Sequence, residues 1–124
     1  MDKRDIERIR KDLEFLSDRI LAVVIYGSRV TGENTERSDI DVCIVAPNTD
    51  SSEIFKETLS VDYDVKIFEL MPLFLKMEVI KNHEIVYARD VLEFYEYLYF
   101  FRKLWKDQEH RQKLTKEEAL KLFG

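Results

Sequence analysis

The sequence has one cysteine, two prolines and three glycines, and it contains no long run of apolar residues. Because Cys43 has no second thiol to pair with, a disulfide within the chain is excluded. No apolar stretch approaches the roughly 20 residues that a membrane-spanning helix needs. The charged N-terminal residues predict a helix and not a signal peptide. We therefore expect a cytoplasmic protein that does not bind membranes.

The chain also lacks an excess of positive charge. Its 25 acidic residues outnumber its 20 lysines and arginines, so the formal net charge is −5. A protein that coats nucleic acid needs a basic surface to neutralise the phosphates. Nucleic acid is therefore not expected as a tight ligand. A small nucleotide is compatible with this charge, because bound metal ions can neutralise its phosphates.

No linker rich in proline or glycine, no repeat and no low-complexity tract divides the chain. Its 124 residues are enough for one hydrophobic core and too few for two. We therefore expect residues 1–124 to form a single domain, with a core at about 15–90 and a helical extension at about 91–124.

Hydrophobic periodicity predicts alternating helices and strands along the chain. Turn residues and capping patterns, such as Asp50 three residues before Glu53, predict the boundaries between them. This order indicates an α/β or α+β fold. Helices are predicted over residues 3–17, from Ser28, from Asp50, from Pro72, over 91–106 and from Thr115 to near Gly124, and strands over residues 20–26, 39–46, 61–68 and 84–88, the last of them at an edge of the sheet.

The connections between the first three strands predict which strand ends meet. The polar link after the first strand is short for a parallel crossover, so the second strand is expected to run antiparallel beside the first. The next link contains a predicted helix and is long enough for a right-handed parallel crossover. This topology places Gly27 and Ser28, Asp39 and Asp41, and Asp64 at one edge of the sheet.

The aspartates at this edge have the chemistry of a metal site. Asp39 and Asp41 are two apart on a strand, so their side chains share a face. Two close carboxylates repel each other unless a cation lies between them. Oxygen ligands with room for water and phosphate suit Mg²⁺. A third carboxylate, from Asp62 or Asp64, would complete a two-metal site with ions roughly 3.5–4 Å apart, suited to in-line displacement at phosphorus.

The turn after the first predicted strand suits a phosphate. Gly27 removes the side chain where a phosphate must approach closely. Ser28 offers a hydroxyl, and the amides of a helix that begins there would point at an anion. Arg29 and Arg37 could each reach a triphosphate as positively charged clamps.

With these residues in place, the sequence resembles the polymerase-β-type nucleotidyltransferase superfamily. Within it, the chain resembles the minimal nucleotidyltransferases (MNT), the antitoxins that are paired with HEPN toxins. The likeness covers roughly residues 15–90. It is carried by Gly27-Ser28-Arg29, Gly32 and Ser38-Asp39-Ile40-Asp41, and more loosely by Asp64-Val65, Pro72-Leu73 and Val86-Tyr87.

The resemblance implies a mixed four-stranded sheet flanked by helices, with a helical extension at the C-terminus. It implies that two Mg²⁺ ions are bound by three catalytic aspartates and that ATP is the nucleotide. Asp64 is preferred over Asp62 as the third ligand on this ground, and it would help to activate the acceptor oxygen through the metal. The catalytic and metal-binding residues are then Asp39, Asp41 and Asp64, and the nucleotide-binding residues are Gly27, Ser28, Arg29 and Ser38.

The resemblance also implies the reaction. AMP would pass from ATP to a hydroxyl with release of pyrophosphate, and the acceptor would be a tyrosine of a partner HEPN toxin whose RNase activity is thereby blocked. One alternative is a non-catalytic antitoxin that binds nucleotide and neutralises its partner by contact. Another is a nucleotidyltransferase that modifies a small molecule, such as an aminoglycoside.

Apolar residues at helical spacing predict the inward-facing side chains of two helices. The second of these helices carries further apolar residues, which would be covered if the last helix folded back, or would bind another protein. In the helix from Pro72, the expected inward residues are Leu73, Phe74, Met77 and Ile80. In the helix over 91–106, they are Phe94, Leu98, Phe101 and Trp105, flanked by Tyr97 and Leu104, whereas Leu92, Tyr95, Tyr99 and Phe100 point elsewhere.

Overall fold

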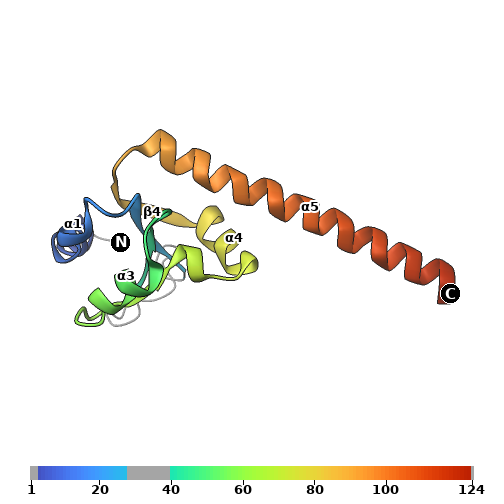
Figure 1. Cartoon of the computed structure of the whole chain (residues 1–124), viewed down its shortest axis with the longest axis horizontal. Coiled ribbons are helices and arrows are strands. Elements are labelled where there is room, and N and C mark those ends of the chain that lie inside the picture. Colours follow the sequence, from blue (N-terminus) through green and yellow to red (C-terminus); the bar gives the residue numbers. More distant parts are fainter. Residues whose placement is uncertain (1–2, 28–39, 124) are drawn as a thin grey trace.

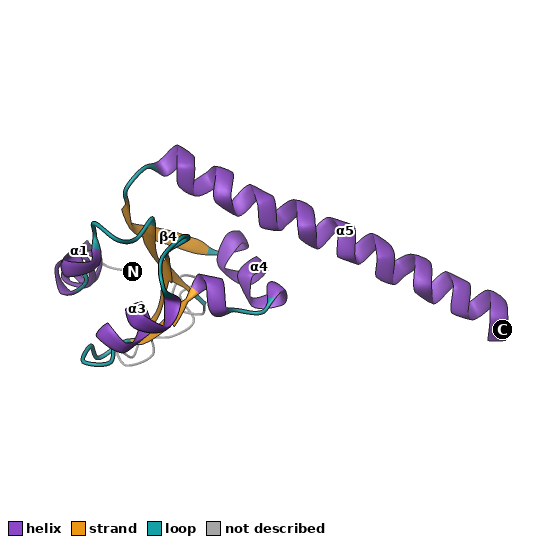
Figure 2. Cartoon of the chain, in the orientation of Figure 1, coloured by secondary structure: helices purple, strands orange, loops and turns teal. Residues whose placement is uncertain are grey.

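The computed structural model describes residues 3–27 and 40–123, with side chains described as far as residue 109. Helices and strands alternate along this part of the chain (Figure 2). The helices are α1 (Lys3–Asp12), α3 (Ser51–Glu57), α4 (Leu73–Lys81) and α5 (Val91–Phe123), with short 3₁₀ helices η1 (Glu14–Leu16) and η3 (Phe68–Leu70). The strands are β1 (Ala22–Tyr26), β2 (Asp41–Val45), β3 (Asp64–Ile67) and β4 (His83–Ala88).

The four strands form one mixed sheet in the order β3-β2-β1-β4. Strand β1 pairs antiparallel with both β2 and β4, and β2 pairs parallel with β3. The predicted topology is therefore confirmed: an antiparallel first pair, a parallel crossover through α3, and β4 at an edge. Strand β3 is shorter than the predicted 61–68, because residues 61–63 form bends before the ladder begins.

Helices cover both faces of the sheet (Figure 1). Helices α1 and α3 contribute Ile9 and Ile54 to one buried cluster, and α4 and α5 contribute Val79 and Phe94 to the other. Burial of a side chain of this size contributes roughly 1.5–3 kcal/mol. Because both faces are covered, β1 is buried at all five of its residues, which explains its continuous apolar sequence.

One predicted helix boundary and one predicted apolar stripe have the cause that the sequence suggests. The side chain of Asp50 accepts hydrogen bonds from the amides of Ser52 and Glu53, so it caps the N-terminus of α3. At the start of the chain, the apolar stripe packs on the sheet: Ile9, Leu13 and Leu16 are buried and Ile6 is partly buried.

Helix α4 packs differently from the prediction. Met77 is buried, but Phe74 is 63% exposed and the fully buried residue is Val79. The prediction for Phe74 was wrong because α4 lies against both the sheet and α5, and apolar residues surround it on several sides. Periodicity alone cannot decide which face of such a helix is outside.

The two predicted C-terminal helices are one continuous helix, α5, which projects beyond the sheet domain (Figure 1). The predicted break at Thr115 was wrong: no glycine or proline interrupts residues 91–123, so a capping pattern alone does not end the helix. The last helix therefore does not fold back over α5, and the apolar residues predicted to point elsewhere stay exposed: Leu92, Tyr95, Tyr99 and Phe100. The predicted inward stripe is confirmed at Phe94 and Leu98, which are buried.

The carboxylate of Glu69 connects α5 to the sheet. Its Oε1 accepts a hydrogen bond of 3.0 Å from the amide of Ala46, at the end of β2. Its Oε2 accepts one of 2.8 Å from the hydroxyl of Tyr97. Hydrogen bonds to a charged group contribute roughly 1.5–3 kcal/mol each, so this carboxylate fixes the crossing of α5 over the sheet.

Among the described residues, no helix is both long enough and apolar enough to cross a membrane. Cys43 is fully buried, and burial raises the pKa of its thiol, so it is a packing residue and not a nucleophile.

Candidate active site

Two carboxylates meet where β2 and β3 begin. Asp41 and Asp64 are register partners in the parallel pair, and the amide of Asp64 donates a hydrogen bond of 3.2 Å to the carbonyl of Ile40. Register partners lie on the same face of a sheet, about 4.8 Å apart. This is the face that α4 and α5 cover, because Cys43, two residues after Asp41, belongs to their buried cluster. The structure thus brings together two of the predicted aspartates.

Gly27 lies directly against one of these carboxylates. It follows Tyr26, the last residue of β1 and the register partner of Asp41. A Cβ at Gly27 would lie 2.7 Å from Oδ2 of Asp41, closer than a real contact allows. The backbone at Gly27 also has a φ of +84°, a conformation that other residues rarely adopt. Close approach and backbone geometry therefore both require glycine at this turn.

Tyr26 is a site residue that the sequence analysis missed. Its side chain is 4% exposed, and its hydroxyl has no hydrogen-bond partner among the described residues. Burial raises the pKa of the phenol well above its usual value, and the nearby charges of Asp41 and Asp64 raise it further. The hydroxyl therefore stays protonated beside the two carboxylates. The available signal was its place at the end of a strand, immediately before Gly27.

Asp64 is the more accessible of the paired carboxylates. Its side chain is 54% exposed and lies 3.7 Å from the ammonium of Lys66. An ion pair this exposed is worth about 0–1 kcal/mol, so it leaves the carboxylate available to another cation. Asp62, the other candidate, is exposed and precedes β3. Of the two, Asp64 is the one in register with Asp41.

The remaining predicted site residues lie outside the part of the chain that the structure describes, as does the helix predicted from Ser28. Within the described residues, no group of three or more His, Cys, Asp and Glu side chains could hold a metal ion. The residues outside are Ser28, Arg29, Arg37, Ser38 and Asp39.

The paired carboxylates and the Gly27 turn fit a hydrated divalent cation. Asp41 and Asp64 supply hard oxygen ligands from one face of the sheet, and the missing side chain at Gly27 leaves space beside Asp41 Oδ2. Mg²⁺ typically binds one or two carboxylates and keeps its other positions for water and substrate phosphates. The donor set therefore suits Mg²⁺ better than a metal that prefers nitrogen or sulfur ligands.

Residues 7–92 match the protein family described as polymerase beta, nucleotidyltransferase. The chain belongs to this nucleotidyltransferase family. The match extends from α1 to the start of α5, so it includes β1, β2 and β3, whose ends form the site. This chain is accordingly a nucleotidyltransferase, and the predicted enzyme class is confirmed.

A relative of known sequence narrows the class of activity. This chain is 43% identical over 93 residues to a protein of Methanocaldococcus jannaschii that is named as a protein adenylyltransferase. The alignment covers 75% of each of the two chains. The predicted resemblance to adenylyltransferases that act on proteins is therefore confirmed at the level of the family.

Solved structures share the fold at low sequence identity. A toxin-antitoxin crystal structure with AMP-PNP matches with a TM-score of 0.69 at 14% identity, covering 93% of this chain and 98% of the other. A complex of a tri-AMPylated Shewanella oneidensis HEPN toxin with its MNT antitoxin matches with a TM-score of 0.67 at 13% identity, covering 97% and 99%. The predicted mixed four-stranded nucleotidyltransferase fold is thus confirmed, and both matches include α5.

Buried phenols predict a loss of stability at alkaline pH. Burial raises the pKa of Tyr26 and of Tyr97, and in Tyr97 the hydrogen bond to Glu69 adds to the effect. Above pH of about 10 the unfolded chain releases these protons while the folded chain keeps them, so the free energy of unfolding falls as the pH rises. Melting temperatures between pH 8 and 11 would measure this. The double variant Tyr26→Phe/Tyr97→Phe should show a shallower decline, and an unchanged slope would contradict the assignment.

Proposed function

We propose that this nucleotidyltransferase transfers AMP from ATP, with Mg²⁺, to a tyrosine hydroxyl of a partner HEPN toxin. It would thereby act as the antitoxin of the pair, in the cytoplasm and as a single domain. The observation that carries the proposal is the register pairing of Asp41 and Asp64 beside the Gly27 turn. An antitoxin that neutralises its partner by contact alone has no need for two carboxylates held on one face where two parallel strands begin.

In the proposed reaction, the tyrosine oxygen forms a bond to the α-phosphorus of ATP. The bond between that phosphorus and the oxygen bridging to the β-phosphate breaks, and pyrophosphate leaves. Mg²⁺, when bound, would supply positive charge to the phosphates and to the attacking and leaving oxygens. The proton of the hydroxyl passes to solvent.

Each residue of the site has a proposed role in this reaction. Asp41 and Asp64, with Asp39, would hold the metal ions. Gly27 would let a phosphate approach the end of β1, and Ser28, Arg29 and Ser38 would bind the triphosphate. Asp64 would meet the acceptor side, because it is the more exposed carboxylate.

A protein acceptor and the toxin partner are supported by similar proteins. The relative from M. jannaschii is named for transfer to a protein. Among the structures that share the fold, one is a complex in which the HEPN toxin is described as tri-AMPylated. The small-molecule acceptor has no comparable support.

The test is to incubate the chain with the protein encoded by its neighbouring gene, Mg²⁺ and ATP labelled at the α-phosphate. We expect label on the toxin, located to a tyrosine by mass spectrometry, and no label when EDTA is present. ATP labelled at the γ-phosphate is the matched control, because its label should leave with pyrophosphate. If no label transfers and an Asp41→Asn variant still neutralises the toxin, the protein is a binding antitoxin and the proposal fails.

A further inference from the structure

A cleft of about 420 Å³ lies between α4 and α5, on the face of the sheet that also carries the paired carboxylates. Its floor is apolar: Met77 is buried, and Ile80 and Trp105 are partly buried. The charged residues around it are Lys81, Arg102, Lys106 and Glu109. The cleft therefore combines an apolar floor, which includes one aromatic ring, with a mainly positive rim.

This positive rim is unusual for the chain as a whole. The formal net charge of the protein is −5, yet three of the four charged residues at the cleft are cations. Lys81, Arg102 and Lys106 are exposed, and none of them forms an ion pair with another described residue. Unpaired cations gathered on an acidic protein favour an acidic partner at this place.

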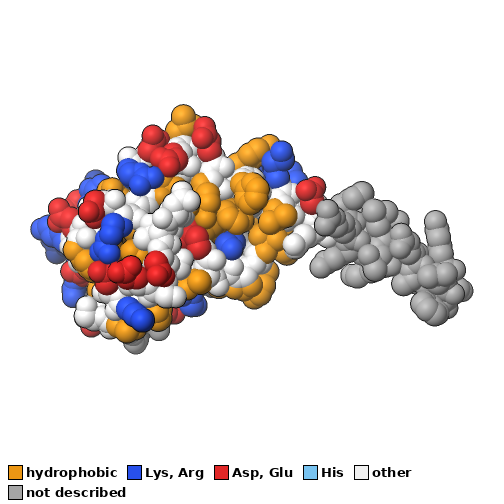
Figure 3. Space-filling view, viewed as in Figure 1, with side chains coloured by type: hydrophobic (Ala, Val, Ile, Leu, Met, Phe, Trp, Pro, Cys, Tyr) orange, Lys and Arg blue, Asp and Glu red, His pale blue; other side chains and the backbone are white. Residues whose placement is uncertain are grey.

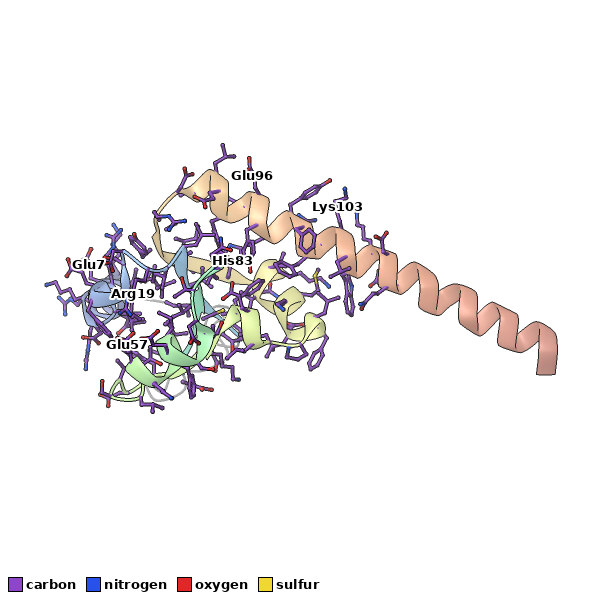
Figure 4. The ribbon with its side chains drawn as sticks, in the orientation of Figure 1. Glu7, Arg19, Glu57, His83, Glu96 and Lys103 are labelled. Atoms are coloured by element: carbon purple, nitrogen blue, oxygen red, sulfur yellow. The ribbon has the colours of Figure 1, made fainter. Side chains whose placement is uncertain are left out.

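The surface next to the cleft continues the same character. A second groove on α5 shares Arg102 and Lys106 and adds Tyr99, Lys103 and one acidic residue, Asp107. Lys103 points away from the sheet and lies over the ring of Tyr99, 5.8 Å from its centre (Figure 4). Hydrophobic side chains gather over α4 and the first half of α5 (Figure 3). Aromatic residues with arginine are typical of protein-binding surfaces.

The cleft also lies within reach of the carboxylates. Lys81 is the last residue of α4, and two residues later His83 pairs with Tyr26, which pairs with Asp41. Two strand spacings and two residues of chain amount to about 16 Å. An extended peptide covers about 3.3 Å per residue, so roughly five to eight residues connect the cleft with the carboxylate edge.

We propose that the α4–α5 cleft binds an acidic, aromatic-containing segment of the protein that receives AMP. Acidic side chains of the segment pair with Lys81, Arg102 and Lys106, and an aromatic or aliphatic side chain packs on Trp105. The acceptor tyrosine lies roughly five to eight residues from that segment. This inference rests on the proposed function for the identity of its occupant, but the binding step can be measured without any transfer of AMP.

The probe is a fluorescein-labelled peptide with an acidic, phenylalanine-containing block, a neutral spacer of six residues and one tyrosine. Fluorescence anisotropy with the full chain should show that the acidic peptide binds. A peptide whose acidic residues are replaced by their amides should bind at least about tenfold more weakly, because the charge-assisted contacts are lost. The double variant Arg102→Glu/Lys106→Glu should lose a similar factor. It should regain affinity for a peptide in which the acidic block is replaced by lysines.

A matched control separates the cleft from the total charge of the protein. Arg10→Glu/Lys56→Glu makes the same change in net charge at exposed positions of α1 and α3, on the opposite face of the sheet. This variant should bind the acidic peptide like the original chain. If both double variants lose affinity equally, or if the acidic and amide peptides bind alike, the proposal is overturned.

Further outcomes identify a different occupant or a failure elsewhere. If single-stranded RNA or free ATP competes for the cleft and loses affinity in the Arg102→Glu/Lys106→Glu variant, the site belongs to that ligand and the proposal is overturned. If the acidic peptide binds as expected but its tyrosine never receives AMP, the docking surface stands and the proposed function fails. If AMP is transferred with the same KM to acidic and amide peptides, the proposed function stands and the docking surface fails.

Discussion

Asparagine in place of Asp41 is expected to lower kcat for AMP transfer by about 10³-fold without unfolding the protein. The amide keeps the size of the side chain but removes the negative charge that pairs with a divalent cation. A loss of this size corresponds to about 4 kcal/mol of transition-state stabilisation. Initial rates with α-labelled ATP would measure kcat, and circular dichroism would show that the fold and the melting temperature are preserved.

Asp62→Asn is the matched control for this variant. Asp62 is an exposed aspartate two residues before the start of β3, and it is the candidate over which the family resemblance preferred Asp64. Its replacement should change kcat less than about threefold, because it is not in register with Asp41. Equal losses in the two variants, or more than a tenth of the activity left in Asp41→Asn, would refute the assigned carboxylate pair.

Alanine in place of Gly27 is expected to cost both stability and activity. The added Cβ would lie 2.7 Å from Oδ2 of Asp41, so the carboxylate has to move. The positive φ of +84° adds roughly 1–2 kcal/mol of backbone strain. We expect kcat to fall about 10²-fold, because small displacements of catalytic groups have effects of this size. Activity per folded molecule, measured well below the melting temperature, is the relevant readout.

A second turn with a positive φ separates strain from site geometry. Asn48, after the other end of β2, has a φ of 66° and lies away from the carboxylates. Asn48→Ala should therefore also lower the melting temperature, since alanine disfavours this conformation, while leaving kcat unchanged. If Gly27→Ala behaves in the same way as Asn48→Ala, the close approach to Asp41 has no role in catalysis.

The affinity for the metal gives an independent readout of both site variants. Titration of Mn²⁺ as a substitute for Mg²⁺ should show weaker binding in Asp41→Asn and in Gly27→Ala than in Asp62→Asn. This measurement does not depend on the identity of the acceptor protein.

Much of the fold follows from local patterns in the sequence. Asp50 caps α3 because its side chain reaches amides two and three residues away, which is a property of the sequence itself. The continuous apolar run of β1 predicts a strand covered on both faces, and the structure has helices on both. The lengths of the links predicted the antiparallel and parallel pairings, and with them the meeting of Gly27, Asp41 and Asp64.

Other features could not be read from local patterns. The exposure of Phe74 depends on where α5 lies, because α4 offers apolar residues to several neighbours. The predicted length of α5 was wrong, because the residue types of a capping pattern also occur in the interior of a continuous helix. The position of Tyr26 before Gly27 did not by itself indicate a site residue, because the importance of Tyr26 comes from a hydroxyl buried beside carboxylates on two other strands.

The sequence by itself determined the chemistry of this protein: a glycine turn after a buried strand, and aspartates at the entrances of the next two strands. These depend on residue type and spacing, which need no partner to be recognised. Only the tertiary structure decided that Asp64, and not Asp62, faces Asp41, and that Lys81 and Arg102 lie at one cleft. Those relations join residues far apart in the chain, and they are set by strand register and by the crossing of α5 over α4, which the packing of the whole domain determines.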